Sequence, residues 1–219
     1  MLAVLQAYAG QVSVWDWCLE PFLDALGERS DSAELLTIFT STGGYPLGEH
    51  GRIGQVDDSL FSEALHVPLM IRGLPLLEPG TRIVHSAQPS DLTPILTEWF
   101  SIPGVGAATA PAWLHPGPLN PAGDLAVAVS SGEIAIRVPR WFLRAKRPKE
   151  GEFPGSPAPD AVLYLKPDDR WDANPIADRC PDIVQAMWQQ AREFLSAKHP
   201  DRRNPISLPP ELYRGVTVG

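Results

Sequence analysis

The sequence is poor in cysteine, in long apolar runs and in basic residues, and each shortage argues against a class of protein. Its 219 residues contain two cysteines, Cys18 and Cys180, and no CxxC pair, so neither a disulfide framework nor that kind of zinc site is expected. No apolar run approaches the roughly 18 residues that a membrane-spanning helix needs. Acidic residues outnumber basic ones 26 to 18, giving a net charge of -8. Such a surface repels phosphate backbones, so we expect neither a membrane nor a nucleic acid as a partner.

The N-terminal end lacks the basic residue of a secretory signal peptide, since no Lys or Arg precedes the apolar residues of 1–17. The sequence therefore does not indicate a compartment. What it has in quantity is proline and glycine, with 24 and 18 residues, beside a hydrophobic fraction of 44%. This composition predicts a folded core joined by long, ordered, irregular connections.

The first part of the chain, residues 1–104, has the pattern of an α/β domain. Apolar residues recur there at helical spacing, and they are followed by short apolar runs of strand length. A helix followed by a buried strand is half of a βαβ unit, which predicts a parallel sheet. Pro21 is expected to kink the first helix or to split it at Glu20. The expected elements are a helix over 2–26, strands over 35–39 and 67–72, and a helix over 90–100.

The second part, residues 124–198, predicts a small antiparallel α+β subdomain. Ser130, Ser131 and Gly132 separate two apolar runs in the manner of a hairpin turn. An amphipathic helix follows the strands. The expected elements are strands over 125–129, 134–138, 141–145 and 161–165, a helix over 181–198, a Pro/Gly-rich connector over 105–123 and an extended tail over 199–219.

The loop after the strand at 35–39 is the candidate site, because ligands bind where loops leave the carboxyl ends of strands in open α/β sheets. It is rich in glycine, whose backbone N–H groups can form an anion-binding nest. Arg52 would add positive charge and His50 a proton donor, with Glu49 beside them. A tight turn with a capping glutamate is the other interpretation of the same residues. A new metal site at Glu49 and His50 with Asp57 and Asp58 is a further alternative.

Several motifs occur in a fixed order along the chain. They are TSTGGY at 40–45, LGEHG at 47–51, FSE at 61–63, HVPLMI at 66–71, SDLTPIL at 90–96, VLYL at 162–165 and NPIA at 174–177. In this order they resemble the sulfatase family of the alkaline-phosphatase-like superfamily. The resemblance implies the C-terminal portion of that superfamily's parallel α/β sheet, followed by a four-stranded antiparallel sheet with a C-terminal helix.

The same resemblance implies that the catalytic machinery is incomplete. The family's formylglycine nucleophile arises in a C-x-P-S-R motif, which neither Cys18 nor Cys180 provides. Its calcium-ligating Asp-His pair aligns to Thr42 and Gly43, so two ligands of the cation are replaced. The family also places a lysine soon after LGEHG, whereas this sequence has Gln55 nearest that place and no lysine before Lys146.

Three hypotheses follow. In the first, the chain is a degenerate sulfatase-like protein without hydrolase activity, with no catalytic residue intact, no metal or cofactor, and Glu49, His50 and Arg52 as candidate ligand-binding residues. In the second, it is the C-terminal part of an arylsulfatase-type hydrolase whose catalytic half lies upstream or on another chain, and calcium is then the cofactor. In the third, it has a purely structural role. Because the family's sheet has more strands, we expect an exposed sheet edge near 35–39 that a second copy or a partner chain covers.

Overall fold

The computed structural model of the chain describes residues 1–29, 31, 35–54, 58–75, 78–83, 85–102, 111, 114, 125–148, 158 and 160–196. The chain forms two compact units, which are described separately. Unit 1 comprises residues Met1–Asp57 and Glu63–Thr81, and unit 2 comprises Asp58–Ser62 and Arg82–Gly219. The expected tail over 199–219, and the connector over 105–123 apart from Pro111 and Leu114, lie outside the described residues.

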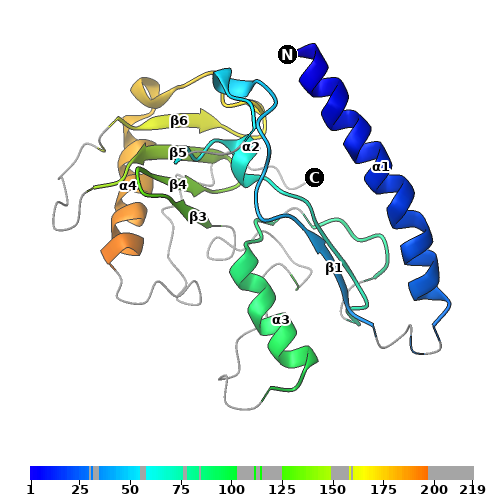
Figure 1. Cartoon of the computed structure of the whole chain (residues 1–219). Coiled ribbons are helices and arrows are strands. Elements are labelled where there is room, and N and C mark those ends of the chain that lie inside the picture. Colours follow the sequence, from blue (N-terminus) through cyan, green and yellow to red (C-terminus); the bar gives the residue numbers. More distant parts are fainter. Residues whose placement is uncertain are drawn as a thin grey trace. The chain divides into compact units, whose positions relative to one another are not determined.

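Unit 1 is built from a long helix and one pair of strands (Figure 1). Strand β1 (Thr37–Thr40) pairs with β2 (Leu69–Arg72) in antiparallel register, Thr37 opposite Arg72 and Thr40 opposite Leu69. The expectation of a parallel sheet is wrong for this pair. Parallel neighbours need a crossover that carries the chain back to the starting end, usually through a long helix. In its described residues, 41–54 and 58–68, the connection holds a 3-10 turn, η2 (Glu49–Gly51), and the four-residue helix α2 (Ser62–Leu65).

The opening helix α1 (Leu2–Gly27) confirms the helix expected over 2–26. The predicted split at Glu20 is wrong, because α1 continues through Pro21 and its last turn is closed by the Glu28 N–H donating to Asp24 O (3.0 Å). A proline inside a helix removes one backbone bond, and the turns on either side keep theirs. None of the residues of α1 is buried. Among the described residues of unit 1, only Pro46 and Ala64 are buried, so this unit has almost no core of its own.

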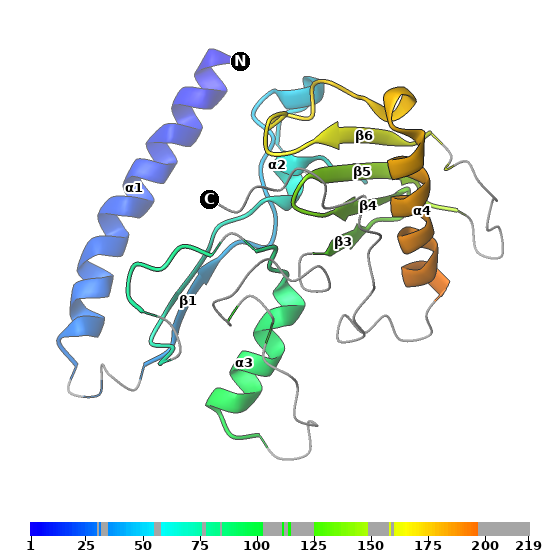
Figure 2. The same ribbon diagram turned by 180° about the vertical axis from the view of Figure 1, so that it is seen from behind.

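Unit 2 is an antiparallel sheet of four strands in the order β3-β4-β5-β6, covered on one face by helix α4 (Figures 1 and 2). This confirms the predicted four-stranded sheet with a C-terminal helix. The expected turn at 130–132 joins β3 to β4, and the Ser130 N–H donates to Glu133 O (2.9 Å). The elements are η3 (Pro89–Asp91), α3 (Leu92–Trp99), β3 (Ala126–Val129), β4 (Glu133–Arg137), β5 (Trp141–Lys146), β6 (Val162–Leu165), η5 (Ala177–Arg179) and α4 (Pro181–Ser196).

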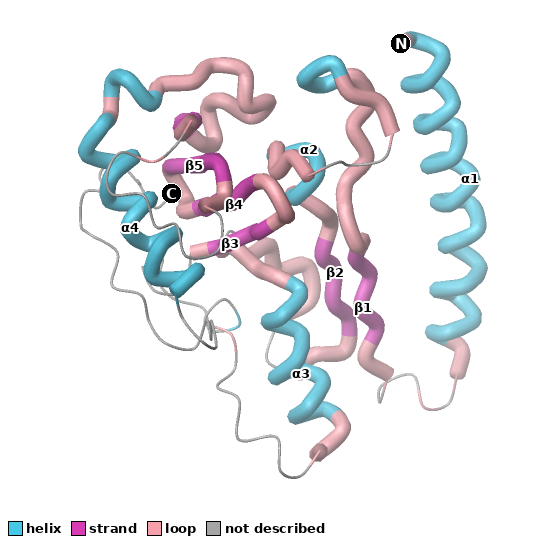
Figure 3. The backbone as a smooth tube through the Cα atoms, turned by 60° about the vertical axis from the view of Figure 1, so that its left-hand side comes forward, coloured by secondary structure: helices cyan, strands magenta, loops and turns pink. Residues whose placement is uncertain are grey.

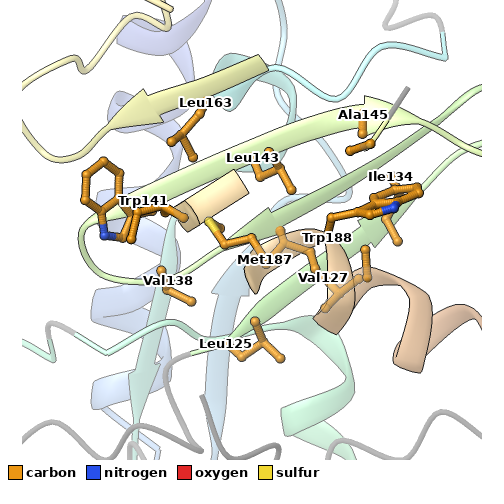
Figure 4. Packing of buried hydrophobic residues seen from close by; sticks show 14 residues of the cluster. Leu125, Val127, Ile134, Val138, Trp141, Leu143, Ala145, Leu163, Met187 and Trp188 are labelled. Carbon is orange, nitrogen blue, oxygen red and sulfur yellow. The ribbon is translucent and has the colours of Figure 1, made fainter. Parts of the chain in front are cut away.

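The core of unit 2 lies between the sheet and α4. Alternate residues of a strand point to opposite faces, so Ile136 and Leu143, which are paired across β4 and β5, reach the same side as Leu163 of β6. Met187 and Trp188 of α4 pack onto them and are almost fully buried (Figure 4). The chain's buried apolar residues are concentrated here, and unit 2 therefore has the interior that unit 1 lacks.

The side chain of Gln88 hydrogen-bonds to the backbone of the edge strand β3, where a further strand would otherwise pair. The amide of Gln88 donates through Nε2 to Val127 O (2.6 Å) and accepts from the Val127 N–H at Oε1 (3.2 Å). The Gln88 N–H in turn donates to Asp91 Oδ2 (2.8 Å), which fixes the start of η3. These bonds satisfy edge groups that would otherwise be open to pairing with another chain. Figure 3 shows the strands of both units in magenta.

None of the helices in the described part of the chain combines the length and the apolarity needed to cross a membrane.

Candidate functional site

The glycine-rich loop after β1 is compact and closed on itself. Leu47 and Ile53 form an antiparallel bridge, and the Gly54 N–H donates to Pro46 O (3.0 Å). Between them the chain makes the 3-10 turn of η2, where the Arg52 N–H donates to Glu49 O (3.0 Å). Gly48 has φ = 128°, a conformation that residues with a side chain rarely adopt. The loop is thus an ordered hairpin-like turn.

Gly44 is needed where the loop meets helix α2. A Cβ at this position would lie 1.7 Å from the carbonyl oxygen of Glu63, closer than any non-bonded pair can come. The Gly44 N–H donates to Ala64 O (2.9 Å). The second glycine of TSTGGY therefore serves packing of the loop on α2, and no ligand is required to explain it.

Glu49 and His50 are both engaged by neighbouring protein groups. The Leu47 N–H donates to Glu49 Oε2 (2.6 Å), so this carboxylate caps the turn, as the alternative interpretation of the loop predicted. The ring of His50 lies with Nδ1 2.9 Å from Glu63 Oε1, and both side chains are largely shielded from solvent. His50 has φ = 52°, an uncommon left-handed conformation for a residue with a side chain. Its pairing with Glu63 opposes release of this strain.

The positions that align with the family's cation ligands offer little to a cation. Thr42 and Gly43 are exposed, and Ser41 Oγ donates to Gly43 O (2.8 Å). Calcium prefers six to eight oxygen ligands with several carboxylates among them, and Thr42 supplies one hydroxyl where Gly43 has no side chain. No group of three or more His, Cys, Asp or Glu side chains in the described residues is arranged to hold a metal ion. The residues present therefore do not fit the cation that the resemblance implies.

The remaining sequence candidates lie elsewhere. Arg52 is half-buried beside η2 in unit 1. Gln55 and Asp57 lie outside the described residues. Asp58 belongs to unit 2, where its carbonyl oxygen accepts from Ser130 Oγ (2.5 Å) and its carboxylate from Ser131 Oγ. The metal site considered at Glu49, His50, Asp57 and Asp58 therefore stays a prediction.

Unit 2 contains a buried polar cluster that the sequence did not reveal. On the sheet face away from α4, Arg144 Nη2 donates to both carboxylate oxygens of Glu133 (2.9 and 2.8 Å). The Leu60 N–H donates to Glu133 Oε2 (2.9 Å), and the guanidinium of Arg144 lies 3.4 Å from the centre of the Phe61 ring. Tyr164 lies close by, and burial raises the pKa of its phenol. The short segment 58–62 is thereby fixed to a sheet more than seventy residues away.

A second buried pair closes the turn after β6. Lys166 Nζ donates to the carboxylate of Asp172, and the two side chains are 5% and 0% exposed. Asp172 also accepts from the N–H and Oγ of Ser62 (2.8 and 3.0 Å). Asp169 accepts from the N–H groups of Ala173 and Asn174 (2.9 and 2.8 Å). The sequence motifs included neither acid, and Asp169 and Asp172 serve as structural anchors of the turn.

Comparison with known proteins gives a fold and no more. No protein-family model matches the sequence, and no curated protein sequence matches it. Among solved structures, the chain is similar to a sulfatase of Bacteroides thetaiotaomicron from a genetic locus for the metabolism of multiple glycosaminoglycans. The TM-score is 0.54 at 19% sequence identity, and the match covers 79% of this chain. The fold is therefore sulfatase-like.

The likeness concerns part of the larger protein. The chain spans 39% of the length of the Bacteroides structure. The α/β architecture expected from the motifs is thus supported at the level of the fold, while the parallel sheet is not seen in the described residues.

Proposed function

We propose that the chain is a sulfatase-like protein that does not hydrolyse esters by itself and that binds an anionic group at the loop of residues 41–54. The observation that carries this proposal is that Glu49 and His50, two of the polar side chains of the loop, are each bonded to a neighbouring protein group. Glu49 is held by the Leu47 N–H and His50 by Glu63. Glu49 Oε2 and His50 Nδ1 are thus already engaged, so either of these two atoms could bind a metal or take part in proton transfer only by giving up its present bond.

The chemistry of sulfate-ester cleavage supports the same proposal. Cleavage needs a nucleophile, a positive charge to stabilise the transferring group, and a group to protonate the leaving oxygen. The sequence has no C-x-P-S-R motif and no lysine before Lys146. Thr42 and Gly43 cannot replace a carboxylate and a second ligand at a cation. Each loss removes a separate contribution, so restoring one would not restore turnover.

Anion binding is what the loop can still do. The guanidinium of Arg52 offers positive charge and hydrogen-bond donors to a sulfate, phosphate or carboxylate group. The N–H groups of Gly43, Gly44, Leu47, Gly51, Arg52 and Gly54 already donate to protein acceptors, so Arg52 is the main candidate donor. The Bacteroides sulfatase comes from a locus for glycosaminoglycan metabolism, so a sulfated glycosaminoglycan oligosaccharide is a suitable probe. Because the net charge of the protein is -8, we expect weak binding that depends on Arg52.

The test has two arms. Incubation of the purified chain with p-nitrophenyl sulfate, with and without calcium, is expected to give no turnover above buffer. Turnover that disappears in Glu49→Ala or His50→Ala would falsify the proposal. In the binding arm, calorimetry with a sulfated chondroitin oligosaccharide is expected to show about a 5-fold or greater loss of affinity in Arg52→Ala, in line with the loss of one charged hydrogen bond. Arg72→Ala at the exposed end of β2 is the matched control, and equal effects of the two changes would contradict a site at the loop.

A second candidate function is favoured by one observation. Since the chain spans 39% of the matched sulfatase, it can instead be the C-terminal part of a complete sulfate-ester hydrolase. Reading the DNA upstream of the Met1 codon distinguishes the two. An in-frame C-x-P-S-R motif, with calcium-dependent turnover by the longer product, supports this candidate. Absence of the motif leaves the non-hydrolytic proposal.

A further inference from the structure

Helix α1 carries an apolar seam with the spacing of a coiled coil. Successive seam residues are separated alternately by three and four positions, the repeat that lets two helices keep the same faces together. The pattern lasts for three heptads. The seam consists of Leu5, Tyr8, Val12, Trp15, Leu19, Phe22 and Leu26.

Most of this seam is open to solvent. Five of its residues expose between 38% and 67% of their surface: Leu5, Tyr8, Val12, Trp15 and Phe22. Tyr8 stacks on Tyr45 with ring centres 5.9 Å apart, while Leu19 and Leu26 are half-buried. Among the described residues of unit 1, only Pro46 and Ala64 are buried, which is too small a core to cover the rest.

The exposed area is large enough for association. Taking about 150 to 250 Å² for a fully exposed aromatic side chain, the five open residues present about 500 Å² of mostly apolar surface per chain. Two copies together would bury about 1,000 Å², which is the lower limit for a specific protein–protein interface.

The charges of α1 select the direction of pairing. Its charged residues are Asp16, Glu20 and Asp24, all acidic and all in the second half of the helix. Parallel helices would gather the acids of both copies at the same end of the pair. Antiparallel helices centred between Val12 and Trp15 would put them at opposite ends, where Asp16, Glu20 and Asp24 are level with the uncharged Gln11, Ala7 and Ala3 of the other copy. In the same register, Leu5 packs against Phe22 of the other copy, Tyr8 against Leu19 and Val12 against Trp15.

We propose that α1 is a self-association surface, and that two copies of this chain pair their α1 seams in antiparallel orientation. The interaction is independent of the ligand loop and does not rest on the proposed function. Each copy carries a net charge of -8, so repulsion opposes the pairing and salt, which screens it, is expected to strengthen the dimer.

Sedimentation of the full chain over a wide range of concentration tests the association. We expect a monomer–dimer equilibrium whose Kd rises by about 30-fold or more in Trp15→Glu, the size of a hot-spot loss. Trp17→Glu is the matched control: it places the same charge on α1 at a residue that is 76% exposed and off the seam, and it is expected to leave Kd unchanged. Phe22→Ser is a milder second seam variant, and circular dichroism verifies that each variant keeps its helices.

Disulfide trapping tests the direction. In a Cys18→Ser, Cys180→Ser background, a mixture of Leu5→Cys and Phe22→Cys chains is expected to form a mixed disulfide, whereas Leu5→Cys chains alone are not. Trapping of Leu5→Cys with itself would overturn the antiparallel arrangement. The self-association is overturned if the chain remains monomeric at every concentration, or if Trp15→Glu and Trp17→Glu raise the Kd of the dimer equally. The seam of α1 would then be a surface for a different polypeptide.

Discussion

At the scale of single residues, Arg137 is a buried charge of unit 2 with an unsatisfied polar atom. It lies at the end of β4 on the polar face of the sheet, and its Nη1 is buried with no hydrogen-bond partner among the described residues. Burial lowers the pKa of its guanidinium to about 10, although the nearby carboxylate of Asp172 raises it. Burial of this cation therefore lowers the free energy of unfolding of unit 2.

We expect Arg137→Met to stabilise unit 2. An apolar side chain of similar length removes the cost of burying the cation, and such replacements gain about 1 kcal/mol or more in favourable cases. The lowered pKa determines how the difference depends on pH. Below pH about 10 the buried guanidinium is charged and lowers the stability of the wild type by the full amount. Above pH about 10 the folded state loses this proton before the unfolded state does, so the destabilisation declines. The advantage of Arg137→Met should thus be largest at neutral pH and shrink in alkaline solution.

Urea unfolding at several pH values measures this difference. Arg179→Met, at an exposed arginine of η5, is the control and should change little. A loss of stability in Arg137→Met at neutral pH would mean that the guanidinium has a stabilising partner.

At the scale of elements, the turn between β6 and η5 depends on a buried ion pair. Asp172→Asn keeps the shape and left-handed backbone of this residue but removes its charge, leaving Lys166 buried and unpaired. Breaking such a pair from one side costs about 3 kcal/mol or more. The free energy of unfolding of unit 2, followed by the fluorescence of buried Trp188, should fall accordingly.

The chain offers a close control for this change. Asp160 also has a left-handed backbone and also pairs with a lysine, Lys146, but both side chains are 68% exposed. Asp160→Asn should leave the unfolding curve unchanged, because water solvates both charges. Equal effects of the two substitutions would show that burial of the Lys166 pair contributes nothing.

The elements also show what could be predicted from the sequence. Periodicity identified α1, α4 and the strands of unit 2, because helical apolar spacing is typical of helices and short apolar runs between turn residues are typical of strands. It gave the wrong pairing direction for β1 and β2 and a false break at Pro21. Pairing direction depends on how the chain returns over the 28 residues between these strands, which local spacing does not encode.

The sequence singled out the candidate loop but few of its contacts. The motif LGEHG led to Glu49 and His50, and the capping role of Glu49 was one of the three interpretations of the loop. The partner of His50 could not be predicted, because Glu63 lies 13 residues further along the chain and no local spacing links the two. The hydrogen bond from Leu60 to Glu133, 73 residues apart, could not be predicted either. It depends on a tertiary fold that places segment 58–62 on the sheet of unit 2.

At the scale of the whole molecule, the two units differ in what can hold them folded. The large buried apolar residues belong to unit 2, where Ile136, Leu143 and Met187 are 1%, 1% and 0% exposed. Unit 1 has Pro46 and Ala64 as its buried residues in the described part of the chain. Because hydrophobic burial is the main favourable contribution to folding, the stability of the chain should reside in unit 2.

Native-state hydrogen exchange tests this difference. The amides of β4 and β5 are expected to exchange only on global unfolding, whereas those of β1 and β2 should exchange through local opening of much lower free energy. The amides of α1 should be poorly protected in dilute protein and better protected as concentration rises, since pairing of α1 between copies would shield them. Protection of β1 and β2 equal to that of β4 at low concentration would show that unit 1 is stabilised by contacts other than its own buried side chains.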